Sequence, residues 1–152
     1  MCRLIRSFLL SLSLLLACPM LWAAPSGEGD ASSSQYNLLM QARGHELTGI
    51  WIMETSADGS VVGTVINEFG VKAFDFLYSG GRAQVQDVVG PLDRWYIRRV
   101  LRKDITFILS ALPTGQDATL GKRRLVRLDD GAIRVENARF HIRYTLTPLT
   151  SD

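Results

Sequence analysis

Val61–Val89 reads VVGTVINEFGVKAFDFLYSGGRAQVQDVV, and this stretch decides the fold. Apolar residues recur every second position in three short runs, at 61–66, 71–78 and 82–89, which indicates β-strands. Asn67–Gly70 predicts a corner between the first two runs, and Gly80-Gly81 predicts a tight hairpin turn before the third. Parallel strands need long crossover connections, so these short turns predict an antiparallel meander.

The sequence on both sides of this stretch extends the sheet. A strand at 47–54 precedes it, and strands at 119–128, 132–137 and 139–147 are predicted near the C-terminus. In the last of these, apolar Phe140, Ile142, Tyr144 and Leu146 alternate with polar residues. A short helix is predicted before the sheet, at Ser34–Gly44, because serine can cap its start and glycine can end it.

Leu92–Ala111 predicts the longest helix. At 100° per residue, its large apolar residues fall on one arc and its arginines on the other. A rival interpretation ends this helix near Lys103 and makes 105–112 a strand. Asp104 falls within the apolar arc, so it needs either a partner, such as Arg127 or Arg143, or a break in the helix.

The predicted fold class is α+β. We expect a curved antiparallel sheet of about seven strands, an open or half barrel, with a short N-terminal helix and one long amphipathic helix packed across it. One domain is expected at 35–150, after a small, polar, flexible linker at 24–34. A chain of this size can bury roughly two-thirds of its unfolded surface.

The N-terminus predicts export. Arg3 and Arg6 precede an apolar run at 8–17, and small residues follow it, as in a secretory signal peptide. One interpretation is a signal peptide at 1–23, cleaved after Ala23. The other is a signal at 1–17 followed by a lipobox, Leu15-Leu16-Ala17-Cys18, which would make Cys18 a lipid anchor. Either predicts an exported protein of the periplasm or outer membrane. Cys2 and Cys18 are the only cysteines, so no disulfide framework is expected after cleavage.

Charge is distributed unevenly along the chain. Glu28–Asp93 holds 9 acidic and 3 basic residues, whereas Arg94–Asp152 holds 12 basic and 6 acidic residues. The two halves could pair within the fold, or the basic half could form a cationic face for anionic lipid or an acidic partner.

The sequence contains no motif of a known catalytic centre. It lacks a nucleophile elbow, a phosphate-binding loop and a dinucleotide fingerprint. His45 and His141 are the only histidines, and neither has neighbours at metal-ligand spacing. Asp129-Asp130 precedes Gly131 and is explained by a hairpin turn. We therefore expect no enzyme, cofactor, metal or nucleic-acid partner.

A family resemblance rests on Gly63–Phe76, where Asn-Glu-Phe-Gly is followed by Phe-Asp-Phe, and on the helix after it. Over about Thr48–Leu112 the chain resembles uncharacterised exported proteins of Bacteroidetes-type bacteria. More remotely it is similar in architecture to the lipoprotein-localisation superfamily, the periplasmic carrier and outer-membrane receptor of lipoproteins. That similarity implies binding of lipid or lipoprotein acyl chains inside the curved sheet. It carries over no individual functional residue.

Two groups of candidate residues follow. The strand at 71–78 is apolar on both faces, so its aromatic residues either pack in the core or line a ligand cavity. The predicted cavity residues are Trp51, Phe74, Phe76, Tyr78, Val100 and Phe107. Trp95 lies on the arginine arc of the helix, where it either tucks under a loop or meets a membrane interface. The predicted face for lipid headgroups or an envelope partner is Trp95, Arg98, Arg99, Arg102 and Lys103. A structural or interaction module docking through this basic helix is the alternative to an acyl-chain carrier.

Overall fold

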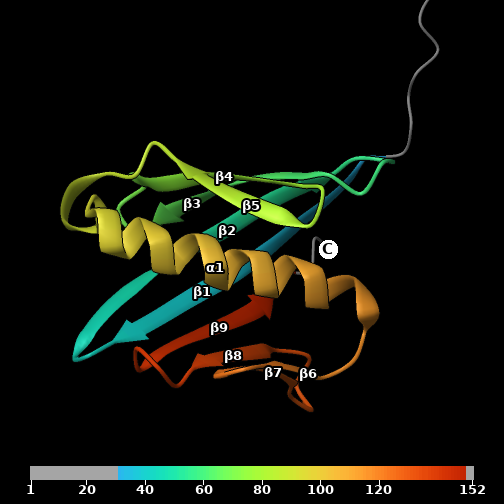
Figure 1. The fold of residues 1–152 in the computed structure, drawn as a ribbon. Helices are drawn as coiled ribbons and strands as arrows, with labels where there is room; N and C mark the ends of the chain where they lie inside the picture. Colours follow the sequence, from blue (N-terminus) through green and yellow to red (C-terminus); the bar gives the residue numbers. More distant parts are fainter. Residues whose placement is uncertain (1–30, 150–152) are drawn as a thin grey trace, which may run out of the picture.

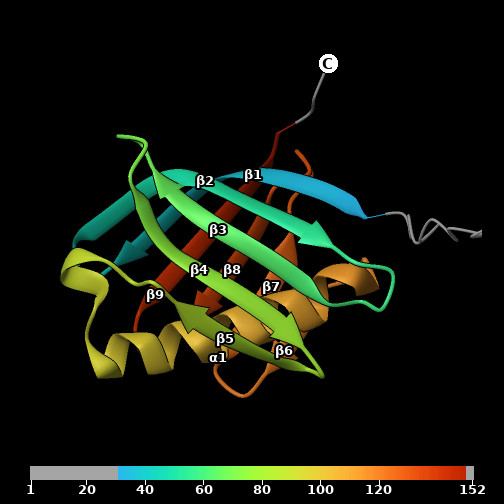
Figure 2. The same cartoon turned by 90° about the horizontal axis from the view of Figure 1, so that it is seen from above.

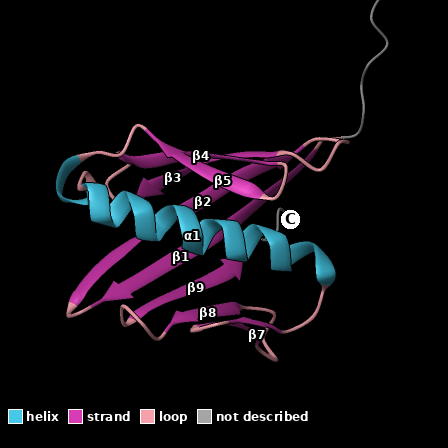
Figure 3. Cartoon of the chain, viewed as in Figure 1, coloured by secondary structure: helices cyan, strands magenta, loops and turns pink. Residues whose placement is uncertain are grey.

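The computed structural model describes residues 31–149, so the predicted signal peptide, Cys18 and most of the predicted linker lie outside the described residues. The N-terminal half of the sheet is followed by the one long helix of residues 31–149, α1 (Trp95–Ala111), and then by the C-terminal strands (Figures 1 and 3). The strands are β1 (Ser32–Ala42), β2 (His45–Thr55), β3 (Val61–Asn67), β4 (Lys72–Ser79), β5 (Arg82–Gln86), β6 (Ala118–Leu120), β7 (Arg123–Arg127), β8 (Ile133–Asn137) and β9 (Ile142–Pro148). Short 3-10 turns flank the helix at Gly90–Leu92 and Leu112–Thr114.

All the strands belong to one antiparallel sheet with the order β5-β4-β3-β2-β1-β9-β8-β7-β6. Strands β2 to β5 follow one another as the meander that the sequence predicts, and β1 precedes them in the same antiparallel order. The C-terminal strands then join the free side of β1, through its pairing with β9. The sheet curves so that its two ends face one another, and α1 runs along the open side between them, against β5 and β7 (Figures 1 and 2). The predicted α+β class and the helix across a curved sheet are confirmed.

The predicted N-terminal helix is wrong, because Ser34–Gly44 lies mainly in strand β1. This strand pairs with β2 from Ser32 to Ala42 and with β9 from Tyr36 to Ala42. Leu38 and Met40 are buried, so the buried side chains of this segment are two positions apart, as in a strand. A central strand gains hydrogen bonds on both sides, and this tertiary gain overrides a weak local preference for helix. The first strand also begins inside the predicted linker, at Ser32.

The described part of the chain has nine strands instead of about seven. One additional strand is β1, and the other arises because the predicted strand at 119–128 is two strands, β6 and β7. Gly121 has a φ of 61° between them, and that backbone conformation turns the chain at a residue without a side chain. The final strand begins at Ile142, so Phe140 lies in the preceding turn and not on the predicted apolar face.

The long helix is continuous, and the rival strand at 105–112 is wrong. Its apolar arc is buried at Leu101, Ile105 and Ile108, which each have 2% exposure or less. The core lies between this arc and the concave face of the sheet. Phe76 packs against Trp51 with 4.7 Å between ring centroids. The Phe76 ring also lies over Gly63, where any side chain would collide with it.

Candidate functional site

A buried polar cluster joins α1 to the C-terminal strands. Asp104 is 1% exposed and lies among apolar side chains. Its Oδ1 atom accepts hydrogen bonds from Arg123 Nε on β7, at 2.6 Å, and from Asn137 Nδ2 on β8, at 2.8 Å. Its Oδ2 atom accepts one from Tyr144 Oη on β9, at 2.9 Å. One carboxylate thus links the helix to three strands.

This cluster confirms that Asp104 needs a partner, but the partner is Arg123. Arg127 instead donates to the Leu112 carbonyl oxygen at the end of the helix, at 2.8 Å, and Arg143 pairs with Glu136 at 3.1 Å. Burial raises the pKa of Asp104 above its usual value, and the hydrogen bonds from Arg123 and Tyr144 oppose that rise. The carboxylate is enclosed by its own partners, so the cluster fastens the helix and does not present a reactive group.

Tyr144 makes stability depend on pH in alkaline solution. Burial, followed by the charge of Asp104, raises the pKa of Tyr144 well above its usual value of 10.0. The unfolded tyrosine loses its proton near pH 10, whereas the folded one holds it. The stabilisation is therefore complete below about pH 10 and is lost as pH rises above it. Above this pH, we expect the urea midpoint of Tyr144→Phe to decrease less steeply with pH than that of the wild type. Tyr96→Phe, at a residue 54% exposed, should leave the fall unchanged.

Of the predicted cavity residues, four lie on the sheet, at Trp51, Phe74, Phe76 and Tyr78, and two lie on α1, at Val100 and Phe107. Trp51, Phe74, Phe76 and Phe107 are 1–3% exposed, and Tyr78 and Val100 are half-buried. The first four belong to the main apolar cluster, with Tyr78 packed against it. Trp51 Nε1 is buried and has no hydrogen-bond acceptor within the described part of the chain. Whether these side chains ever make room for an acyl chain stays a prediction.

The predicted headgroup face lies on the outer side of α1. Trp95 is 75% exposed, so it does not tuck under a loop, and its ring meets that of Tyr96 edge-on at 6.0 Å. Arg99, Arg102 and Lys103 are also exposed. Arg98 is partly buried and pairs with Asp93 at 2.7 Å.

Further exposed apolar side chains lie at the end of the sheet where α1 begins. Phe69, in the turn between β3 and β4, is 80% exposed, and Val71 beside it is 54% exposed. A hydrogen bond of 3.0 Å from Val89 N to the Ala73 carbonyl oxygen holds the loop before α1 against this turn. The sequence analysis did not select these residues as a site, since single apolar residues in turns carry no periodic signal.

The two oppositely charged halves of the sequence do not neutralise one another in the fold. Among residues 31–149 there are five ion pairs, and only Arg98–Asp93 joins the two halves. The other basic side chains on the outer side of α1, at Arg99, Arg102 and Lys103, make no ion pair with a described residue. The helix therefore presents positive charge to its surroundings.

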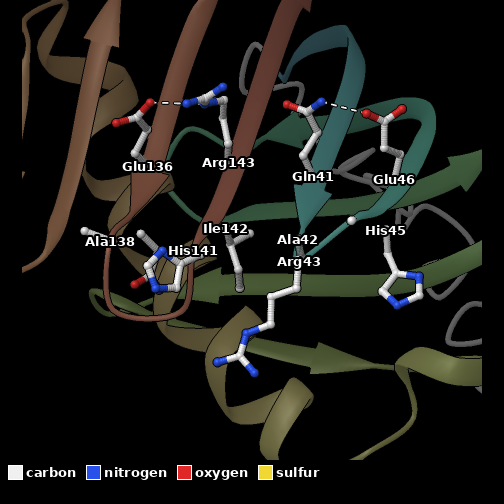
Figure 4. A pocket seen from close by; sticks show the side chains of 12 residues that line it. Gln41, Ala42, Arg43, His45, Glu46, Glu136, Ala138, His141, Ile142 and Arg143 are labelled. Carbon is white, nitrogen blue, oxygen red and sulfur yellow. Dashed lines mark hydrogen bonds and ion pairs between the residues drawn. The ribbon is translucent and has the colours of Figure 1, made fainter.

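A polar notch lies where two hairpin ends meet. The turn between β1 and β2, at Arg43-Gly44, lies beside the turn between β8 and β9, because Ala42 pairs with Ile142. The notch has a volume of about 550 Å³. Figure 4 shows two hydrogen-bonded pairs along one rim, Gln41–Glu46 and Arg143–Glu136, and Arg43, His45 and His141 along the other. Sequence reasoning missed this site, because it joins segments almost 100 residues apart.

No family model and no curated protein matches the chain. Among residues 31–149, no helix combines the length and apolarity needed to cross a bilayer. Those residues also contain no cluster of three His, Cys, Asp or Glu side chains that could hold a metal ion. Assignment of function therefore rests on the surfaces described above.

Proposed function

We propose that this protein is a non-enzymatic component of the cell envelope that docks on an anionic lipid surface through the exposed side of α1. The observation that carries the proposal is the 75% exposure of Trp95 on the same side of α1 as basic side chains that make no ion pair within residues 31–149. An amphipathic ring of this kind suits the boundary between headgroups and acyl chains, and nearby arginines suit the headgroups themselves.

The beginning of α1 adds to the positive potential of this surface. The helix has no side-chain cap at Arg94 and no acidic residue in its first turn, so its first backbone N–H groups are not capped by a side chain and add to the positive end of the helix dipole. Phe69 and Val71 lie at the same end of the sheet and could add apolar contact. Export to the periplasm or outer membrane, with Cys18 as a possible second anchor, belongs to this proposal and rests on the N-terminal sequence alone.

Removing the unpaired positive charges should weaken membrane binding without unfolding the protein. We expect the variant Arg99→Gln, Arg102→Gln, Lys103→Gln to melt within a few degrees of the wild type, because exposed charges typically contribute about 0–1 kcal/mol each. Each lost charge should weaken binding to vesicles containing phosphatidylglycerol by about 1 kcal/mol, and the difference should shrink at high salt. Co-sedimentation with vesicles over a salt series measures both effects.

The control variant is Arg124→Gln, Arg134→Gln, which removes exposed charges from the convex face of the sheet, away from α1. It should bind vesicles nearly as the wild type does. Trp95→Ala should weaken binding to the same vesicles even at high salt, because its contribution is apolar. Equal vesicle binding by the wild type and the α1 charge variant would contradict the proposal, and an acidic envelope protein would then be the better candidate for this face.

Acyl-chain binding in the hollow of the sheet is the second candidate. The specific observation in its favour is the buried Trp51 Nε1 donor, which has no acceptor among the described residues. A buried donor without a partner is costly, and a ligand carbonyl or ester oxygen could satisfy it. In this structure α1 fills the hollow, so such a ligand would have to displace the helix. Native mass spectrometry of protein extracted from its own envelope tests the idea, since a retained lipid would add a discrete mass.

A further inference from the structure

We propose that the notch between the β1–β2 and β8–β9 turns binds a phosphate group. The phosphate could belong to a lipid headgroup or to a soluble phosphate ester, and only the first of these rests on the docking function proposed above. The notch volume of about 550 Å³ lies within the range of small-molecule sites. It opens at the same end of the sheet as the start of α1 (Figures 1 and 2).

The identity of residue 43 is the first observation behind this assignment. Arg43 and Gly44 are the two turn residues of the β1–β2 hairpin, with φ of 47° and 82°. A two-residue turn with two positive φ angles favours Asn-Gly or Asp-Gly, because most other side chains strain that backbone. Arginine is a poor choice for the turn itself. Its side chain makes no hydrogen bond or ion pair with any described residue, so the fold does not explain its presence.

The hydrogen-bonding state of the notch is the second observation. Along with Arg43, the imidazoles of His45 and His141 have no side-chain hydrogen bond to any residue of 31–149. His141 also has a positive φ, of 54°, so this notch is lined by two of the three non-glycine residues that have this conformation in the described part of the chain. Strained backbone of this kind concentrates at functional sites. These three exposed side chains, from two hairpins, all line the notch, and Figure 4 shows them spread along one rim of it.

The acidic groups of the notch favour phosphate at the rim formed by Arg43 and the histidines. Glu136 is engaged by Arg143 at 3.1 Å, and Glu46 accepts a hydrogen bond from Gln41 at 2.7 Å. Both carboxylates lie on the opposite rim (Figure 4). The Arg43 guanidinium can donate two hydrogen bonds to the oxygens of one phosphate and supplies a permanent positive charge, and an imidazole on the same rim can donate a further one.

The test uses NMR titration of the purified protein with inorganic phosphate. We expect saturable shifts confined to residues 41–46 and 138–143. Arg43→Asn should weaken binding by about tenfold or more, as expected for loss of a charge-assisted hydrogen bond. The same substitution should leave the urea midpoint equal to or above that of the wild type, because asparagine suits the turn better. Arg124→Gln, outside the notch, should bind phosphate as the wild type does.

Two results would overturn the proposal: no saturable shift at these residues, or unchanged phosphate affinity in both Arg43→Asn and a His45→Gln, His141→Gln variant. The source of the phosphate follows from vesicles containing phosphatidylglycerol. Weaker vesicle binding by Arg43→Asn supports a headgroup, and unchanged vesicle binding with lost phosphate shifts supports a soluble ester. Failure of the docking proposal looks different, because the wild type would then not bind vesicles while its phosphate shifts persisted.

Discussion

Replacing Asp104 with alanine is expected to lower the free energy of unfolding by about 3–5 kcal/mol, the cost of breaking a buried ion pair by removing one partner. The carboxylate accepts from Arg123, Asn137 and Tyr144, and the last two of these side chains are 1–2% exposed. Removing the acceptor leaves their donors without partners in a site that water does not reach. Urea denaturation at neutral pH measures the loss.

Matched variants separate this loss from a general effect of charge. Asp93→Ala removes an exposed carboxylate that pairs with Arg98, and it should change stability by only about 0–1 kcal/mol. Burial raises the pKa of Asp104, so its ionised form is not favourable in itself. The pair Asp104→Leu, Arg123→Met should therefore recover only the part of the loss that comes from the unpaired Arg123 charge, because the donors of Asn137 and Tyr144 stay without an acceptor. An Asp104→Ala variant as stable as Asp93→Ala would mean that the helix is not fastened here.

The sequence predicts the meander from β2 to β5 well, because each of its turns has strong local chemistry. Gly80-Gly81 allows two consecutive positive φ angles, of 57° and 76°, which a tight hairpin requires. Alternation between the turns then sets which side chains face the core. The long helix is predicted equally well, since its apolar period continues on both sides of Asp104, from Leu101 to Ile108.

Strand β1 shows where local patterns are insufficient. Leu38, Leu39 and Met40 are consecutive, and this run fits either a helix face or a strand covered on one side. What decides is pairing with β9, more than 100 residues later, and no short-range signal reports it. The notch depends on the same pairing. For this reason the sequence could predict neither that Arg43 and His141 line one notch nor where that notch lies.

The partner of Asp104 shows a second limit of prediction from the sequence. The sequence indicates that a strand arginine should meet this carboxylate, and it does. Arg123 and Arg127 both belong to β7, two positions on either side of buried Leu125, and so lie on the same face of the strand. Alternation cannot choose between them. The choice depends on where α1 lies along the strand, which is a property of the packed structure.

Phe76→Ala is the second large effect that we expect, with a loss of about 3–5 kcal/mol in the free energy of unfolding if the ring is part of a filled core. The ring is 2% exposed, contacts Trp51 at 4.7 Å and covers Gly63. No neighbour can easily fill the space, because the opposing backbone of β3 is fixed by pairing with β2 and β4. Phe69→Ala, at a ring 80% exposed in a turn, should change stability by less than about 0.5 kcal/mol.

The size of the Phe76 effect also discriminates between the two proposed functions. If α1 moves aside to admit acyl chains, the helix must be held weakly over this part of the sheet, and the loss on Phe76→Ala should be clearly smaller, with bound lipid lost instead. A full loss of about 3–5 kcal/mol would mean that the hollow is closed by packing. A carrier would then lose that packing free energy each time α1 moved away from the sheet. A docking module that uses only the outer side of α1 would not lose it.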